Sequence, residues 1–227
     1  ETVLEEITCI RLSLPLRMGA ANCYLIRTGG GYFLVDTGGA NRRKQLEVAL
    51  ENAGCRPGHL ALVIVTHGDF DHIGNAAYLR RAFASKIAMH RADVGMAERG
   101  DMFWNRKKGN RLIGVAARAL SGFSKADRFT PDLFLEEGTD LSSYGLEARV
   151  LHLPGHSAGS IGILTAGGAL LCGDLLEKSD KPALGAIIDD QVAAEASVEK
   201  LRGLDIHTVY PGHGGPFLMS LFGVDVA

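Results

Sequence analysis

A run of seven residues carries most of the structural information in this chain: Thr66-His67-Gly68-Asp69-Phe70-Asp71-His72. Two imidazoles and two carboxylates, which are side chains that bind divalent metals, fall within positions 67–72. The apolar segment 62–65 directly precedes the run and predicts a short strand that is buried on both faces. The run therefore predicts a loop at the end of a strand that supplies several ligands to a metal site.

Three further segments, 154–157, 172–174 and 211–214, each place a metal-capable side chain beside glycine. Glycine lets the backbone pass close to such a site. Alternate residues of an extended loop point to the same side, so the side chains of 67, 69 and 71 are expected to converge, while that of 72 turns away. The resulting prediction is two metal ions, the first held by His67, Asp69 and His156, the second by Asp71, His72 and His213, with Asp174 as a bridge.

The surrounding sequence repeats one pattern twice. Apolar and β-favouring runs predict strands over 7–14, 23–27, 32–36, 62–65 and 86–89, then over 146–151, 160–164, 169–172 and 208–210. Helical spacing predicts helices over 41–53, 74–84 and 190–202. Each half thus combines a sheet with helices. Two such halves packed face to face predict an α/β (α+β) fold, a four-layer αββα sandwich, in a single domain over 1–227.

The segment 102–130 differs from both halves because it holds seven basic residues and one acidic residue. Its apolar residues recur at helical spacing and predict a basic, amphipathic helical insertion. We interpret this insertion as a lid over the site, with Phe103, Trp104 and Arg111 facing a small, anionic substrate. The alternative is a helix whose basic face is simply solvated.

Composition limits the remaining classes. Hydrophobic residues make up 46% and charged residues 22% of the chain, which is ordinary for a globular protein. The net charge of −2 predicts no general nucleic-acid binding. No apolar stretch is long enough to span a membrane, and no secretory signal is visible, so a cytoplasmic location is expected. The chain begins at Glu1 rather than Met, which is compatible with removal of an upstream segment. The four cysteines are expected to be reduced thiols, with Cys172 facing the core.

In its order of motifs the chain resembles the metallo-β-lactamase superfamily, in the glyoxalase-II-like form with a bridging aspartate. The matching residues are Asp36 after a strand, the 67–72 run, His156, Asp174 and His213. The resemblance covers about residues 20–215 and implies the αββα fold and a dinuclear hydrolase site. It also implies that Asp36 anchors the metal loop, whereas its sequence context alone leaves a helix N-cap as the alternative.

One position departs from the family's usual run, His-x-His-x-Asp-His, because Asp69 stands where the second His belongs. The added carboxylate lowers the positive charge of the site, which weakens its Lewis acidity and raises the pKa of a bound water. A hard oxygen ligand also shifts preference from Zn toward Fe or Mn. The expected cofactors are therefore two divalent ions, Zn, Fe or Mn, with Fe or Mn favoured. The alternative for Asp69 is a hydrogen-bond acceptor beside the ligands, which would leave one metal position defective.

These features predict a metal-dependent hydrolase that attacks an ester, thioester, lactone or amide with a hydroxide held between two metals. Asp71 is the predicted catalytic residue, because it would orient that hydroxide while binding metal. Asp69 keeps open a diiron redox enzyme, which would reduce oxygen or nitric oxide or dioxygenate a thiol with an external electron donor. A metal-stabilised binding module is the non-enzymatic alternative. Neither the substrate nor the oligomeric state can be read from the sequence.

Overall fold

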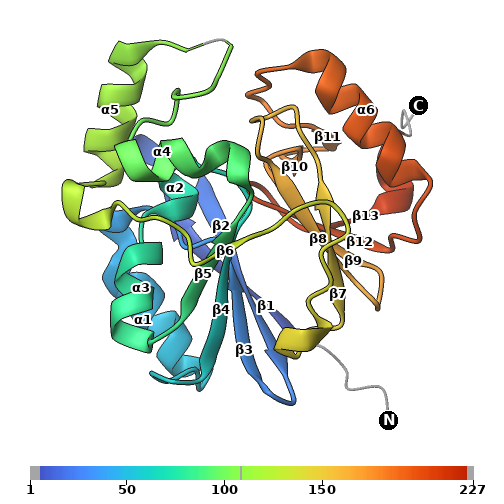
Figure 1. Ribbon diagram of the computed structural model, residues 1–227. Helices are drawn as coiled ribbons and strands as arrows, with labels where there is room; N and C mark the ends of the chain where they lie inside the picture. Colours follow the sequence, from blue (N-terminus) through green and yellow to red (C-terminus); the bar gives the residue numbers. More distant parts are fainter. Residues whose placement is uncertain (1–5, 108, 224–227) are drawn as a thin grey trace.

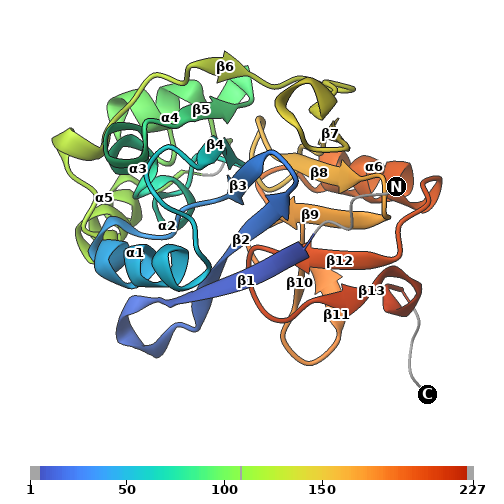
Figure 2. The same cartoon turned by 90° about the horizontal axis from the view of Figure 1, so that it is seen from below.

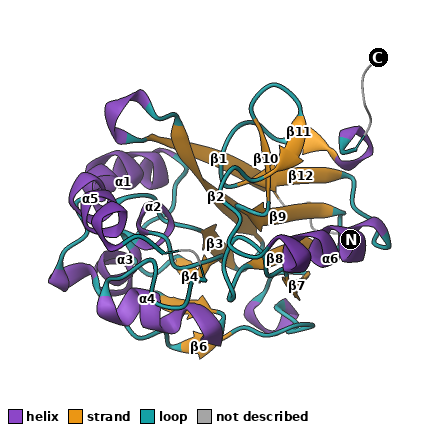
Figure 3. Ribbon diagram, turned by 90° about the horizontal axis from the view of Figure 1, so that it is seen from above, coloured by secondary structure: helices purple, strands orange, loops and turns teal. Residues whose placement is uncertain are grey.

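The computed structural model describes residues 6–107 and 109–223, and it shows the four layers that the sequence predicts. Two sheets pack face to face, with helices on their outer faces (Figure 1). Coloured by secondary structure, one helix lies outside one sheet and the remaining α-helices lie outside the other (Figure 3). The six α-helices of the described residues are α1 (Arg43–Asn52), α2 (Phe70–Ile73), α3 (Ala76–Phe83), α4 (Val94–Arg99), α5 (Arg111–Ser121) and α6 (Gln191–Arg202).

The first sheet has the strand order β1-β2-β3-β4-β5-β6. Its first three strands are antiparallel, and the pairs from β3 to β6 are parallel. The parallel strands end at the same edge of the sheet, which is where the predicted ligand loops begin. The strands are β1 (Glu6–Ser13), β2 (Ala20–Thr28), β3 (Gly31–Val35), β4 (Leu60–Val65), β5 (Lys86–Met89) and β6 (Leu133–Phe134).

The second sheet has the order β13-β12-β9-β8-β7, and a two-stranded ribbon, β10-β11, lies beside it. Viewed from below, β1 and β2 reach across toward β12 (Figure 2). An isolated bridge between Ala21 and His213 joins the two sheets there. The strands are β7 (Ala148–His152), β8 (Ile161–Thr165), β9 (Ala169–Gly173), β10 (Leu176–Lys178), β11 (Pro182–Leu184), β12 (Thr208–Pro211) and β13 (Phe217–Leu218).

Strand β4 shows how the layers are held together. Leu62 and Ile64 face the core between the two sheets, whereas Val63 and Val65 face the core beneath the helices. Side chains alternate along a strand, so a strand covered on both faces must be apolar throughout. The prediction of a doubly buried strand is confirmed. A third core lies under α6 and includes Cys172, which faces inward as expected.

The segment 102–130 is less helical than predicted. Only α5 and a 3-10 turn, Lys125–Asp127, are helical between residues 111 and 130. Gly122 ends α5 in a left-handed conformation with φ of 73°, which a glycine adopts without steric cost. Among the described residues, no helix has both the length and the apolar character needed to cross a membrane.

Candidate metal centre

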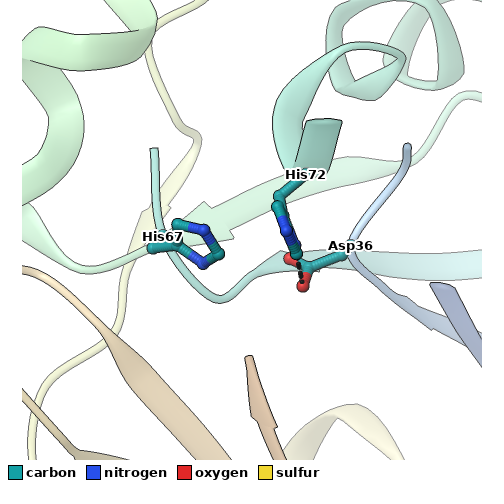
Figure 4. Close-up of side chains that lie close together, drawn as sticks. All are labelled: Asp36, His67 and His72. Carbon is teal, nitrogen blue, oxygen red and sulfur yellow. Dashed lines mark hydrogen bonds and ion pairs between the residues drawn. The ribbon is translucent and has the colours of Figure 1, made fainter. Parts of the chain in front are cut away.

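The end of β3 positions the first part of the site. Asp36 has a φ of 61°, a left-handed conformation that is uncommon outside glycine. Its Oδ1 accepts the Thr66 backbone N–H at 2.8 Å, and its Oδ2 accepts the Thr66 hydroxyl at 2.7 Å. The same Oδ2 lies 2.8 Å from Nδ1 of His72, so the two side chains point at each other (Figure 4). The bond directs Nε2 of His72 inward. Asp36 does not cap the following 3-10 helix, whose N-cap position is Gly39.

The Thr66 hydroxyl links Asp36 to His67 and fixes the orientation of the His67 ring. The hydroxyl donates to Asp36, so it accepts the Nδ1–H of His67 at 2.9 Å. This tautomer leaves Nε2 of His67 with a free lone pair. Burial, together with the neighbouring imidazoles of His72 and His156, lowers the pKa of His67 well below its usual value. The ring is therefore neutral near pH 7, which is the form that binds metal.

The predicted extended loop covers only the first part of the run. Residues 70–73 form the short helix α2, so Asp71 and His72 project from a helix and not from alternate positions of a strand-like loop. His72 is fully buried, whereas the Asp71 side chain is 26% exposed and reaches the cavities described below. Helix geometry, and not strand alternation, separates these two neighbours.

Two groups of three side chains at the centre each offer ligand atoms within 4.8 Å of one another: His67, His156 and Asp174 form one, and Asp71, His72 and His213 the other. A third group, Asp36, His67 and His72, meets the same limit, but Asp36 already accepts from Thr66 and is bonded to His72. Asp174 lies between the first two groups. Its Oδ2 is 3.7 Å from Nε2 of His67 and 3.2 Å from Nε2 of His213, and its Oδ1 is 3.4 Å from Nε2 of His72. The seven predicted ligands thus lie close together, and Asp69 belongs to none of the three groups.

The donor atoms suit divalent metals. Nε2 of His67 and Oδ1 of Asp174 are buried and have no hydrogen-bond partner among the described residues. Buried polar atoms are rarely left without a partner, so a ligand is expected to satisfy them. Nitrogen and oxygen ligands about 2.0–2.2 Å from a tetrahedral ion lie roughly 3.4 Å apart, close to the separations around Asp174. The residues fit a metal.

Gly212 allows this close assembly. A Cβ at this position would lie 2.0 Å from Oδ1 of Asp174 and 2.9 Å from Cε1 of His72. The backbone at the end of β12 therefore passes directly against two of the predicted ligands. Any side chain larger than hydrogen would displace them.

Asp69 has a cation beside it. Its Oδ2 is 3.1 Å from Nε2 of His156 and 3.8 Å from Nε2 of His67. Nη2 of Arg106 donates to the same Oδ2 at 2.9 Å. Burial alone would raise the pKa of Asp69, but the Arg106 guanidinium and His156 outweigh it and hold that pKa far below its usual value. The sequence analysis missed Arg106, which it counted only as one of the basic residues of the insertion.

Asp93 was also missed, and it joins both halves of the site. It is fully buried. Oδ2 accepts the Gly68 N–H at 3.1 Å and the Ser157 hydroxyl at 2.6 Å, while Oδ1 accepts the Gly159 N–H at 2.8 Å. Gly68 belongs to the first ligand loop, and the other two partners follow His156 in the loop that carries it. One carboxylate therefore sets the separation of two ligand loops, and nothing in its local sequence signals this.

Two cavities meet at Asp71. One has a volume of about 500 Å³ and touches the predicted ligands His156, Asp174 and His213, with both polar and apolar side chains in its lining. The other is about 260 Å³ and lies between α5 and the segment that joins β1 to β2. Leu14 and Met18 line both. The second cavity is mainly apolar, and its further lining includes Leu12, Pro15, Phe70, Met102, Ile113, Ala116, Ala117 and Leu120.

The predicted lid residues lie elsewhere. The Trp104 ring stacks under the Arg99 guanidinium at 3.7 Å and covers Gly95 of α4. Phe103 packs against Gly109 and Gly114. Neither ring lines the two cavities at Asp71. Arg111 begins α5, and its side chain lies outside the described residues.

The charge state of His213 gives a pH prediction. Burial disfavours the charged ring, but the Asp174 carboxylate raises the pKa of His213 to about 9. A metal ligand must be neutral, so below this pH an incoming ion displaces a proton. We expect apparent metal affinity to rise with pH toward about 9, by roughly tenfold per unit for each proton displaced. His72 adds to this slope, because against the effect of burial Asp174 and Asp36 raise its pKa as well.

A titration against a chromophoric chelator over this range measures the effect. His207→Gln is the matched control, because His207 is exposed and pairs with Asp205 away from the site. An affinity that stays constant between about pH 7 and 9 would contradict the expectation.

Comparisons with known proteins agree with this geometry. A family model described as the metallo-beta-lactamase superfamily matches residues 16–213. Human metallo-beta-lactamase domain-containing protein 1 is 31% identical over 209 residues, which cover 89% of this chain and 65% of that protein. The bovine acyl-coenzyme A thioesterase MBLAC2 is 30% identical over 224 residues, covering 87% of this chain and 74% of that protein.

A solved structure, TTHA1623 in a di-iron-bound form, aligns with a TM-score of 0.70 and 30% identity, covering 91% of this chain and 92% of that one. Another neighbour, the metallo-beta-lactamase family protein TTHA1429 of Thermus thermophilus, has a TM-score of 0.69 and 25% identity over 93% of this chain and 74% of its own. The matched residues of the family model include all the predicted ligands, from His67 to His213.

Proposed function

The chain belongs to the metallo-beta-lactamase superfamily and is a metallo-hydrolase; from this premise we propose that it cleaves small acyl esters or thioesters whose acyl group is apolar. The observation that carries the proposal is the pair of cavities that meet at Asp71. One is lined in part by predicted ligands, and the other is mainly apolar. Such a pair suits a substrate with a reactive carbonyl and a hydrocarbon part.

Each cavity supplies a different part of recognition. The apolar cavity would take the acyl chain, with Met18 and Leu14 at the junction. The cavity lined by the predicted ligands would hold the carbonyl beside His156, Asp174 and His213, and Arg11 on its wall would face an anionic leaving group. Lactones and amides of similar shape belong to the same proposal. The name of the bovine relative, an acyl-coenzyme A thioesterase, supports the acyl class.

Asp71 is the proposed catalytic residue because it alone combines membership of a ligand group with contact to both cavities. Burial raises the pKa of its carboxyl group, against the lowering influence of His72 and His213. A carboxylate with a raised pKa is a better proton acceptor near neutral pH. Asp71 would therefore hold the attacking water and accept its proton at a carboxylate oxygen. Divalent ions held by the two ligand groups would supply water activation and carbonyl polarisation.

The metal is proposed to be Zn, Fe or Mn, because imidazole and carboxylate donors suit all three. The di-iron-bound neighbour supports iron as one occupant. The preference for Fe or Mn that Asp69 suggests depends on its negative charge acting on the ion. That charge is shared with Arg106, so the preference is weaker than the ligand count alone implies.

The test is a series of acyl thioesters and matched p-nitrophenyl esters of increasing chain length, assayed before and after metal removal. We expect hydrolysis that a chelator abolishes and added metal restores, with kcat/KM rising with chain length until the cavity is full. Ala116→Phe should fill the cavity and lower kcat/KM for the longest good substrate about tenfold or more relative to the acetyl ester. Ala119→Phe, on the same helix but outside the cavity lining, is the control and should leave the ratio unchanged.

Equal rates for all chain lengths, unaffected by Ala116→Phe, would remove the acyl cavity from the proposal. Hydrolysis that survives complete metal removal would contradict the proposed chemistry itself.

A further inference from the structure

The Arg106 side chain occupies an unusual place for a cation. It is 1% exposed, and its Nη2 is 2.9 Å from Oδ1 of Asp69 and 2.9 Å from Oδ2. The same nitrogen lies 2.9 Å from Nε2 of His156. The guanidinium therefore contacts two of the side chains that the sequence assigns to the first metal ion.

The contacts of His156 leave no free lone pair for a metal. Its Nδ1 lies 2.7 Å from the carbonyl oxygen of Ile187, an acceptor, so Nδ1 carries a hydrogen and a metal would need Nε2. In the neutral ring, Nε2 accepts from Nη2 of Arg106 with its single lone pair. In the protonated ring, Nε2–H donates to Oδ2 of Asp69 at 3.1 Å. In either state an ion can bind His156 and Asp69 together only after these contacts are lost.

The residues on either side of Arg106 are bonded to both halves of the fold. Nδ2 of Asn105 donates to Oδ1 of Asp93 at 3.2 Å. On the other side, the Lys107 N–H donates to Oδ2 of Asp189 at 2.9 Å, and the Lys107 ammonium pairs with Asp190. The segment 105–107, which we call the strap, thus connects the two halves of the fold beside the site. The side chain of its central residue, Arg106, contacts the predicted ligands.

The second ligand group has no such competitor. In the part of the chain that the structure describes, Asp71, the carboxylate of this group, forms ion pairs only with histidines. The same holds for Asp174, which lies between the two groups. The charges of the two groups also differ, because Arg106 neutralises the carboxylate that replaces a histidine at position 69. Coulomb attraction for a dication is therefore weaker at the first group than at the second.

We propose that Arg106 competes with the first metal ion for Asp69 and His156, so that the protein holds one divalent ion tightly at Asp71, His72 and His213 and takes a second only when the guanidinium leaves. Nε and Nη1 of Arg106 are buried and have no hydrogen-bond partner among the described residues. The side chain is therefore held through one nitrogen, and an ion that replaces it breaks few bonds. This inference deepens the proposed metal-dependent function and is tested by ion stoichiometry, not by hydrolysis.

The experiment strips the protein with a chelator and titrates Zn²⁺, and separately Co²⁺, by equilibrium dialysis with elemental analysis. We expect the wild type to bind one equivalent tightly and a second at free ion concentrations at least tenfold higher. Arg106→Gln should bind both in one range, with the second ion at least tenfold tighter than in the wild type. Lys107→Gln, which removes the adjacent charge of the strap, is the matched control and should behave as the wild type.

The two-step isotherm of the wild type tests the proposal even if Arg106→Gln does not fold, and Arg106→Lys, which keeps the charge but shortens the donor, supplies a second variant with an intermediate isotherm. Two equally tight ions in the wild type would overturn the proposal and leave the hydrolase intact. Weaker binding by Arg106→Gln would also overturn it, because Arg106 would then support Asp69 as a ligand. No bound ion in any of these proteins would contradict the metal-dependent function, and this proposal with it.

Discussion

Asp71→Asn is expected to lower kcat/KM for the best acyl substrate by about 10²- to 10⁴-fold, the usual range for removing a positioned proton acceptor. The side chain keeps its size, so the cavities keep their shape, but the amide cannot accept the proton of the attacking water. Burial raises the pKa of Asp71, which means that the native fold disfavours its charge. The melting temperature of the metal-free variant should therefore be unchanged or higher than that of the wild type.

Steady-state kinetics, calorimetry and metal analysis of the same samples separate the possible causes. Asp205→Asn is the control, because the Asp205 side chain is 92% exposed and forms its ion pair with His207, away from the site. A variant that keeps full hydrolytic activity would remove Asp71 from the catalytic role. A variant whose activity returns at high metal concentration would show that Asp71 acts as a ligand alone.

Asp93→Ala is expected to have the largest effect on stability. The substitution removes the acceptor of the Gly68 and Gly159 N–H groups and leaves both buried donors without a partner, whereas the Ser157 hydroxyl keeps Oγ of Ser160 at 2.8 Å. Each unsatisfied buried donor costs about 1–3 kcal/mol, so a loss of roughly 3–5 kcal/mol is expected. For a chain of this length the melting temperature should fall by about 10 °C or more. Metal affinity should fall as well, because the two ligand loops lose their common anchor.

Thermal unfolding of the metal-free proteins measures this effect without the contribution of bound ions. Asp140→Ala is a matched control, since the exposed Asp140 accepts the Ser142 N–H at 2.9 Å and its hydroxyl at 2.7 Å. Its loss should cost about 1 kcal/mol or less, because water replaces the aspartate. Equal changes in the two variants would contradict a special role for Asp93.

The sequence predicted the parts of this molecule that depend on local pattern. The doubly buried strand before His67 could be recognised from its unbroken apolar run, and the four layers follow from the order of strands and helices. The predicted ligands lie at strand ends, and strand ends are marked by glycine and proline. These signals lie within a few residues of the features they predict.

The parts that were missed depend on contacts between distant segments. Asp93 and Arg106 lie 25 and 37 positions from the residues of the metal loop that they bond, and neither has a distinctive neighbour in sequence. The ribbon β10-β11 and helix α4 are too short to show periodicity. An aspartate in place of a histidine did indicate that the local charge had changed. The substitution could not indicate which basic residue of the chain forms an ion pair with that aspartate.

The order of the ligands along the chain has a consequence for biogenesis. His72 and His213 are 141 positions apart, yet their rings lie 5.4 Å from each other. Closing so long a loop lowers the chain entropy before the contacts that stabilise the closed form are made. Pairings of this kind therefore form late in folding. A nascent chain leaving the ribosome therefore has no complete ligand group at His72 until β12 has been synthesised and docked. Ion capture comes at the end of folding, and the ion stabilises only molecules that have closed correctly.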